Sequence, residues 1–119
     1  MKRLALFVLS MAMFPSALAQ FQTVEIGKIQ IAKTLTGTVV DPVDSAVPAV
    51  QVLEVSSDWK TVLRSTTTDG NGKWSLAPVP GQEVYYLRFV AYGFNPLQAR
   101  VELNPRKGRD LRFKLSIAT

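Results

Sequence analysis

The 119-residue chain contains no histidine and no cysteine, and this limits the chemistry that its side chains can perform. Imidazole and thiolate groups are the usual zinc ligands, covalent nucleophiles and general bases of enzymes. Without them, base catalysis near neutral pH requires a carboxylate or a lysine with a strongly shifted pKa. We therefore predict that the protein is not an enzyme and that it carries no metal ion or other cofactor.

The carboxylates that could do chemistry lie in short polar stretches. Asp41 and Asp44 share one such stretch, and nothing around them indicates the cleft that a glycoside hydrolase needs. Asp69-Gly70-Asn71-Gly72 resembles a calcium-binding loop, but it offers one carboxylate and lacks a later bidentate glutamate. We interpret both stretches as turns, in which aspartate oxygens accept backbone amides and glycine permits unusual dihedral angles.

Aromatic side chains at the surface are a second kind of candidate, because sugar rings stack against them. Trp59 falls in a polar loop over residues 56–60, Tyr86 on the outward side of a strand, and Tyr92 just after that strand. Single aromatic residues are also common on surfaces that bind nothing. The sequence therefore leaves two partners open, a protein or, as the alternative, a glycan.

Basic residues gather near the end of the chain, at Arg106, Lys107, Arg109, Arg112 and Lys114. A solvated β-hairpin explains such a group, and attachment to an acidic glycan, lipid headgroups or nucleic acid is the alternative. No nucleic-acid motif and no interleaved aromatic residues accompany the group, so we do not expect a nucleic-acid partner.

The first 19 residues have the features of a cleavable bacterial signal peptide. Lys2 and Arg3 precede an uncharged apolar run over residues 4–14, and Ala17-Leu18-Ala19 forms a small-x-small cleavage site. The run has about half of the roughly 20 residues that cross a bilayer. We predict a mature chain of residues 20–119, periplasmic or extracellular, with no transmembrane segment. Loss of Lys2 and Arg3 leaves 12 basic against 9 acidic residues, a net charge of +3.

The mature chain has the alternating apolar pattern of β-strands, interrupted by Gly, Pro, Asn and Asp. The odd positions from 29 to 39 are mostly apolar and predict one long strand or two collinear ones: Ile29, Ile31, Lys33, Leu35, Gly37 and Val39. Between residues 47 and 55, Glu54 falls on the apolar face, which predicts a bulge near Leu53. Three further rows are assigned to the core: Tyr85, Leu87, Phe89 and Ala91; Leu97, Ala99, Val101 and Leu103; Leu111, Phe113, Leu115 and Ile117. This pattern predicts an all-β, seven-stranded antiparallel β-sandwich.

Three motifs follow one another along the mature chain. The first is TGTVVD at residues 36–41 with VPAVQV at 47–52. The second is TTTDGNGKWSL at 66–76, and the third is PGQEVYYLRFVAYGF at 80–94. Their order and spacing over about residues 35–117 resemble the carboxypeptidase regulatory-like domains of the transthyretin-like group.

The resemblance implies a prealbumin-like sandwich, also described as a carbohydrate-binding-like fold, which commonly accompanies other modules in exported proteins. Related hydroxyisourate hydrolases use histidines that this chain lacks, so the resemblance also implies no catalysis. It gives structural roles to the residues of its motifs: Gly37, Asp41, Asp69, Gly72, Trp74, Gly81, Tyr85, Gly93 and Phe94.

We divide the chain into a signal peptide (1–19), an N-terminal extension (20–34) and a sandwich domain (35–119). The extension is rich in apolar residues and either adds an edge strand to its own sheet, which we expect, or offers that strand to a partner. The sequence thus predicts a secreted, non-catalytic module of the cell envelope with a binding or structural role.

Overall fold

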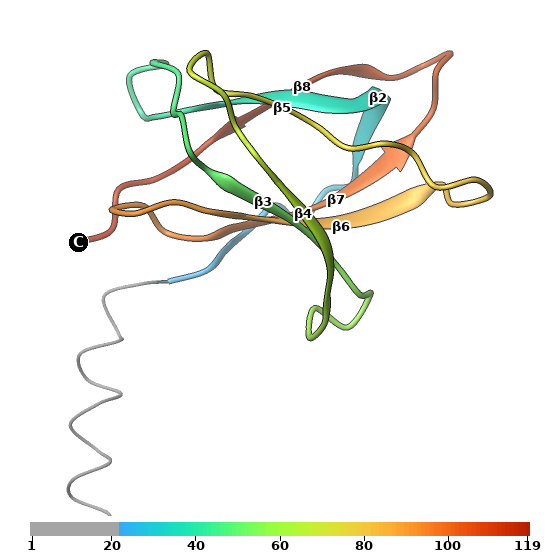
Figure 1. Cartoon of the computed structure of the whole chain (residues 1–119), viewed down its shortest axis with the longest axis horizontal. Helices are drawn as coiled ribbons and strands as arrows, with labels where there is room; N and C mark the ends of the chain where they lie inside the picture. Colours follow the sequence, from blue (N-terminus) through green and yellow to red (C-terminus); the bar gives the residue numbers. More distant parts are fainter. Residues whose placement is uncertain (1–21) are drawn as a thin grey trace, which may run out of the picture.

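The computed structural model describes residues 22–119, which contain eight β-strands and no helix (Figure 1). The predicted all-β sandwich is confirmed, with one strand more than the seven expected, and the predicted signal peptide lies outside the described residues. The strands are β1 (Val24–Glu25), β2 (Gln30–Val40), β3 (Gln51–Val55), β4 (Val62–Thr67), β5 (Lys73–Ser75), β6 (Val84–Val90), β7 (Leu97–Leu103) and β8 (Arg109–Lys114).

Strand β2 joins the two layers of the sandwich (Figure 1). Its first residues, 30–32, pair with β7 and extend the layer ordered β4-β3-β6-β7. Its later residues pair with β5 on one side and β8 on the other, forming the second layer. The pairings β1–β7, β2–β7 and β2–β8 are parallel, so the sheet is mixed and not wholly antiparallel.

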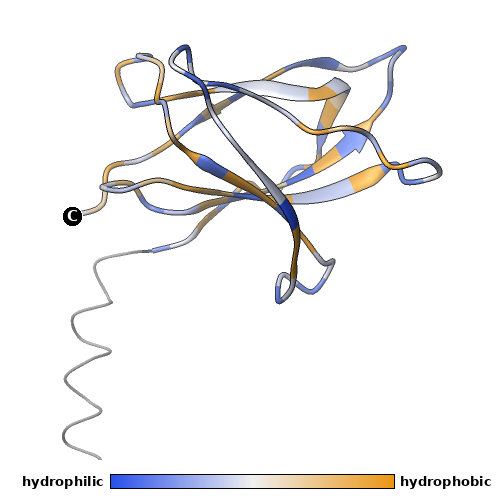
Figure 2. Cartoon of the chain, viewed as in Figure 1, coloured by the Kyte–Doolittle hydropathy of each residue, from blue (hydrophilic) through white to orange (hydrophobic). Residues whose placement is uncertain are grey.

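The core lies between the layers and contains the row predicted for β6. Tyr85, Leu87 and Phe89 are fully buried, while Ala91 is partly buried at the end of the row. The Phe89 ring of one layer lies 4.6 Å from the Phe113 ring and 5.7 Å from the Trp74 ring of the other, centroid to centroid. Figure 2 shows apolar segments along strands of both layers. Aromatic packing therefore joins the layers at the centre of the molecule.

The predicted apolar row of β2 is wrong at its beginning. Ala32 and Leu35 are buried, whereas Ile29 and Ile31 are only partly buried. The reason is a register shift between Ala32 and Gly37 against β8, at the point where β2 passes from one layer to the other. An irregularity of this kind changes which residues face inward, so a strict period of two fails across it.

Ile117 was also assigned wrongly to the core. Strand β8 ends at Lys114, and Ile117 is 59% exposed, where it forms an isolated bridge with Phe94. Phe94 itself is partly buried and packs against the core. The buried row that begins in β8 therefore ends at Leu115, one residue beyond the strand.

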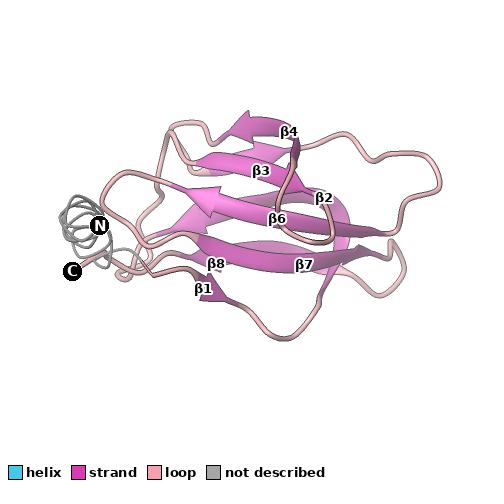
Figure 3. Ribbon diagram, turned by 90° about the horizontal axis from the view of Figure 1, so that it is seen from below, coloured by secondary structure: helices cyan, strands magenta, loops and turns pink. Residues whose placement is uncertain are grey.

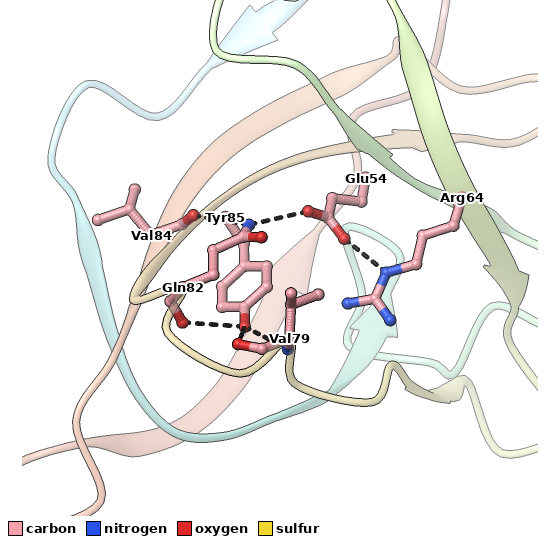
Figure 4. Close-up of polar contacts among 6 residues, drawn as sticks. All are labelled: Glu54, Arg64, Val79, Gln82, Val84 and Tyr85. Atoms are coloured by element: carbon pink, nitrogen blue, oxygen red, sulfur yellow. Dashed lines mark hydrogen bonds and ion pairs between the residues drawn. The ribbon is translucent and has the colours of Figure 1, made fainter.

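Glu54 stays inside the sandwich, although a pairing irregularity is present as predicted. The register between β3 and β4 shifts between Glu54 and Val55, and Glu54 is 2% exposed. Its carboxylate accepts hydrogen bonds from Arg64 Nε at 2.6 Å and Gln82 Nε2 at 2.9 Å (Figure 4). Polar partners, and not the bulge, thus accommodate this residue.

The N-terminal extension pairs with the sheet of its own chain (Figure 3). Strand β1 runs parallel to the start of β7, and the Ile26 amide donates to the Gln98 carbonyl at 2.9 Å. The Ile26 side chain packs against the core, and Arg100 Nη2 donates to the Gly27 carbonyl at 2.7 Å. Because β2 begins at Gln30, the extension supplies β1 and also the start of β2.

Candidate binding surfaces

Trp59 occupies a tightly bonded loop between β3 and β4. Its φ of 67° lies in the left-handed region, which costs energy for a bulky residue. The Trp59 amide donates to the Ser56 carbonyl at 2.8 Å, and Asp58 Oδ1 accepts the Ser56 hydroxyl at 2.5 Å and the Lys60 amide at 3.0 Å. The bond from the Ser56 hydroxyl, followed by the bond from the Lys60 amide, holds the pKa of Asp58 below its usual value, so the carboxylate stays ionised as an acceptor. The loop is thus fixed before any partner binds.

The loop brings Trp59 against Tyr86 of β6. Their ring centroids are 5.3 Å apart and the rings are nearly perpendicular, at 86°. Arg88 Nη2 donates to the Trp59 carbonyl at 2.7 Å. Gln98 of β7 supports Arg88, because its side-chain oxygen accepts from Arg88 Nε and Nη2, both at 2.9 Å, in the amide orientation that satisfies both groups. We call Trp59, Tyr86 and Arg88 the aromatic cluster.

Two of the three aromatic residues singled out in the sequence therefore lie together, and the third lies apart. Tyr86 lies near the beginning of β6 with Trp59 beside it, and both residues are partly exposed. Tyr92 follows the end of β6 and is fully exposed. Val55 pairs with both Tyr86 and Val62, and Val62 is 52% exposed. The exposed Val62 thus lies one strand beyond Tyr86, across the buried Val55.

The basic residues predicted as one group divide between two environments. Arg112 Nη2 and Lys114 Nζ each lie 3.2 Å from Asp44 Oδ1, and together they lower the pKa of Asp44. Arg106 and Lys107 lie in the turn after β7, where their backbone amides donate to Asn104 Oδ1 at 3.1 Å.

Part of this group lines a groove of about 440 Å³ between residues 28–31 and residues 107–112. Its cationic side chains are Lys28, Lys107, Arg109 and Arg112, and we call it the basic groove. Lys28 was not recognised from the sequence, because it precedes β2 and lies far along the chain from the other three cationic residues of the groove. Only the parallel pairing of β2 with β8 brings it near them.

The motif residues shape the backbone and the core. A Cβ on Gly37 would lie 2.9 Å from Trp74 Cζ2, so the indole ring occupies the space that a side chain would need. Asp41 Oδ1 accepts the amides of Val43 at 3.0 Å and Ser45 at 2.9 Å. The remaining members lie in turns or in the core: Asp69, Gly72, Gly81 and Gly93 in turns, and Tyr85 and Phe94 in or against the core.

The acidic side chains of residues 22–119 do not gather into one cluster. No three carboxylates of this part of the chain lie together in a way that would hold a metal ion. Asp69 Oδ1 accepts the amides of Asn71 at 2.8 Å and Lys73 at 3.0 Å, as a turn requires. No helix in the described part of the chain has the length and hydropathy needed to cross a membrane.

Two packed β-layers, shaped by turn aspartates and glycines, define a β-sandwich module. Residues 34–116 match the carboxypeptidase regulatory-like domain, and the chain belongs to this family, part of the transthyretin-like superfamily. The resemblance seen in the sequence is therefore confirmed. Domains of the family are generally non-catalytic. No curated protein sequence matches the chain.

Proposed function

We propose that the mature protein is an exported, non-catalytic module of the bacterial cell envelope that binds a protein partner through the aromatic cluster. The observation that carries this proposal is the fixed position of Trp59 over Tyr86, with Arg88 bonded to the Trp59 backbone. Trp, Tyr and Arg dominate the binding energy of protein interfaces. Because the loop is already ordered, binding costs little further side-chain and backbone entropy.

Export is supported by the sequence of residues 1–19, with its basic start, short apolar run and Ala-Leu-Ala site. The test is expression of the whole chain in a bacterial host, followed by fractionation and measurement of the intact mass. We expect a periplasmic or extracellular protein with the mass of residues 20–119. A cytoplasmic protein that retains residues 1–19 would contradict export.

A glycan is the second candidate partner, because the partly exposed Trp59 ring can stack against a sugar. The geometry favours this less than a protein partner. The rings of Trp59 and Tyr86 stand at 86° to each other and do not form one flat platform.

The deciding experiment compares the mature wild-type protein with Trp59→Ala and with Tyr92→Ala, the control at an exposed aromatic residue away from the cluster. Each protein is immobilised for capture of envelope proteins and applied to a glycan array. We expect a captured protein whose binding weakens about 30-fold in Trp59→Ala, a typical effect of removing a central interface residue, and is unchanged in Tyr92→Ala. Equal capture by all three proteins would contradict a role for the cluster. An array signal that depends on Trp59 would favour the glycan.

A further inference from the structure

The basic groove lies at the boundary of the two layers, away from the β3–β4 loop that carries Trp59. One wall comes from the residues that lead into β2, and the other from the β7–β8 turn and the first half of β8. The walls meet where Gly108 passes the backbone of Ala32, so closely that a Cβ on Gly108 would lie 2.1 Å from the Ala32 carbonyl carbon. The position of the cationic wall is therefore set by backbone packing.

The groove has positive charge that the fold does not neutralise. Lys28, Lys107 and Arg109 form no ion pair with any residue in the range 22–119. Arg112 shares the exposed Asp44 carboxylate with Lys114. Among residues 22–119, Asp110 is the only carboxylate that lines the groove. Four cations against one anion make this surface complementary to a ligand with several negative charges.

The uncharged lining of the groove restricts the kind of anion. Ile29, Ile31 and Leu111 contribute aliphatic side chains, and the described part of the chain places no aromatic residue in the groove to stack against a sugar ring or a base. Asp110 would repel a polymer that is charged at every position. A concave site also suits an inserted chain better than the flat surface of a lipid bilayer.

From these observations we propose that the basic groove binds an extended acidic segment of a protein, in which acidic and aliphatic residues alternate. The acidic side chains pair with Lys28, Lys107 and Arg109, and the aliphatic side chains cover Ile29 and Ile31. In an extended chain, successive side chains point to opposite sides, so one strand can satisfy both kinds of surface. This surface is separate from the aromatic cluster, and its occupation does not depend on the proposed function of Trp59.

The experiment measures fluorescence anisotropy of a labelled peptide of alternating glutamate and valine with the mature protein, at about 0.15 M ionic strength. Matched peptides replace valine with serine, or glutamate with lysine. We expect saturable binding of the glutamate–valine peptide, about tenfold weaker binding of the glutamate–serine peptide, and none of the lysine peptide. Equal affinity for the glutamate–valine and glutamate–serine peptides would overturn the role of the aliphatic side chains that line the groove.

Charge-reversal variants then locate the site. Lys28→Glu and Arg109→Glu should each weaken binding about tenfold or more. Arg106→Glu makes the same charge change in the adjacent turn, outside the groove, and should change affinity less than about twofold. All three side chains are exposed, and equal thermal melts will show that the variants fold. Equal weakening by all three variants would overturn the proposal.

Two further measurements distinguish an acidic peptide from other anionic ligands, and the basic groove from the aromatic cluster. Tighter binding of a sulfated polysaccharide or of anionic phospholipid vesicles than of the peptide would overturn the choice of a protein segment. Trp59→Ala should bind the acidic peptide as the wild type does. Trp59→Ala thus tests the aromatic cluster, whereas Lys28→Glu and Arg109→Glu test the basic groove. Either proposal can fail while the other holds.

Discussion

Glu54 places a carboxylate inside the sandwich, opposite Arg64 on the neighbouring strand. The side chain of Glu54 is 3% exposed and that of Arg64 is 30% exposed, so solvent screens only one side of the pair. Arg64 Nη2 is itself buried and has no partner within the described residues. A charge buried in this way is tolerated only while its counter-charge remains.

Replacing Glu54 with leucine should therefore destabilise the protein through Arg64. We expect Glu54→Leu to lower the free energy of unfolding by about 2–3 kcal/mol, less than for a fully buried pair because Arg64 reaches solvent. The double variant Glu54→Leu/Arg64→Leu should recover most of this loss, since it removes both charges. Urea denaturation measures all three proteins. No recovery in the double variant would mean that packing, and not charge, explains the single variant.

A pH dependence is expected from Asp69, whose pKa is lowered by hydrogen bonds from the amides of Lys73 and Asn71. A carboxyl with a lower pKa in the folded state stabilises the protein above the unfolded-state value of about 3.9. This stabilisation is lost as the pH falls through the folded-state pKa. Asp69→Asn keeps an acceptor without the charge, so its melting temperature should fall less steeply below about pH 4 than that of the wild type.

Thermal melts monitored by circular dichroism between neutral pH and about pH 2 give this comparison. Asp110→Asn is the control, because Asp110 is exposed and forms no ion pair with other described residues. A steep acid transition that persists unchanged in Asp69→Asn would show that the turn carboxylate does not contribute to it.

At the level of elements, the regular strands could be predicted and the irregular strand could not. The row Tyr85, Leu87 and Phe89 was assigned correctly because β6 pairs without interruption on both sides. Strand β2 changes partners along its length, and its apolar row shifts at Ala32. A change of the pairing strand depends on contacts with distant parts of the chain. The local alternation of apolar and polar residues therefore does not reveal it.

The same distinction applies to the candidate binding surfaces. Trp59 and Tyr86 were each recognisable from the sequence, but their contact depends on the left-handed φ of Trp59, set by hydrogen bonds within its loop. Lys28 was not recognised, because its place in the basic groove follows from a long-range parallel pairing. Individual candidate residues could therefore be recognised from the sequence, but which of them lie together in space could not.

The close contact at Gly108 gives a prediction about the start of β8. Gly108→Ala would place a Cβ 2.1 Å from the Ala32 carbonyl carbon and 2.2 Å from the Lys33 amide nitrogen, so the backbone must move. We expect a loss of about 3 kcal/mol in the free energy of unfolding, at the upper end of overpacking effects. Gly70→Ala is the matched control, since nothing lies within 4 Å of its added Cβ. Chemical denaturation that shows equal losses would contradict the close packing of the two strands.

At the level of the whole molecule, the two layers should unfold together. Strand β2 belongs to both layers, and Phe89 packs against Phe113 and Trp74 across the core. The chain has two tryptophans, with Trp59 on the larger layer and Trp74 buried in the smaller one. Each can report on its own layer when the other is replaced by phenylalanine.

We therefore predict that Trp59→Phe and Trp74→Phe each show a single fluorescence transition in urea. In each variant this transition should coincide with the loss of the circular-dichroism signal. The midpoints of the two variants can differ, because each substitution changes stability by itself. Separate transitions by fluorescence and circular dichroism within one variant would show that one layer opens before the other.

Both ends of the described chain meet at the turn that joins β6 to β7. Asn95 Oδ1 accepts the amide of Gln22, Asn95 Nδ2 donates to Ser116 Oγ, and the Ala118 amide donates to the Gly93 carbonyl. Trp59 lies away from this turn, beside Tyr86 near the start of β6. A tether attached through either terminus would consequently leave the molecule beside the β6–β7 turn and leave the aromatic cluster uncovered at its attachment point.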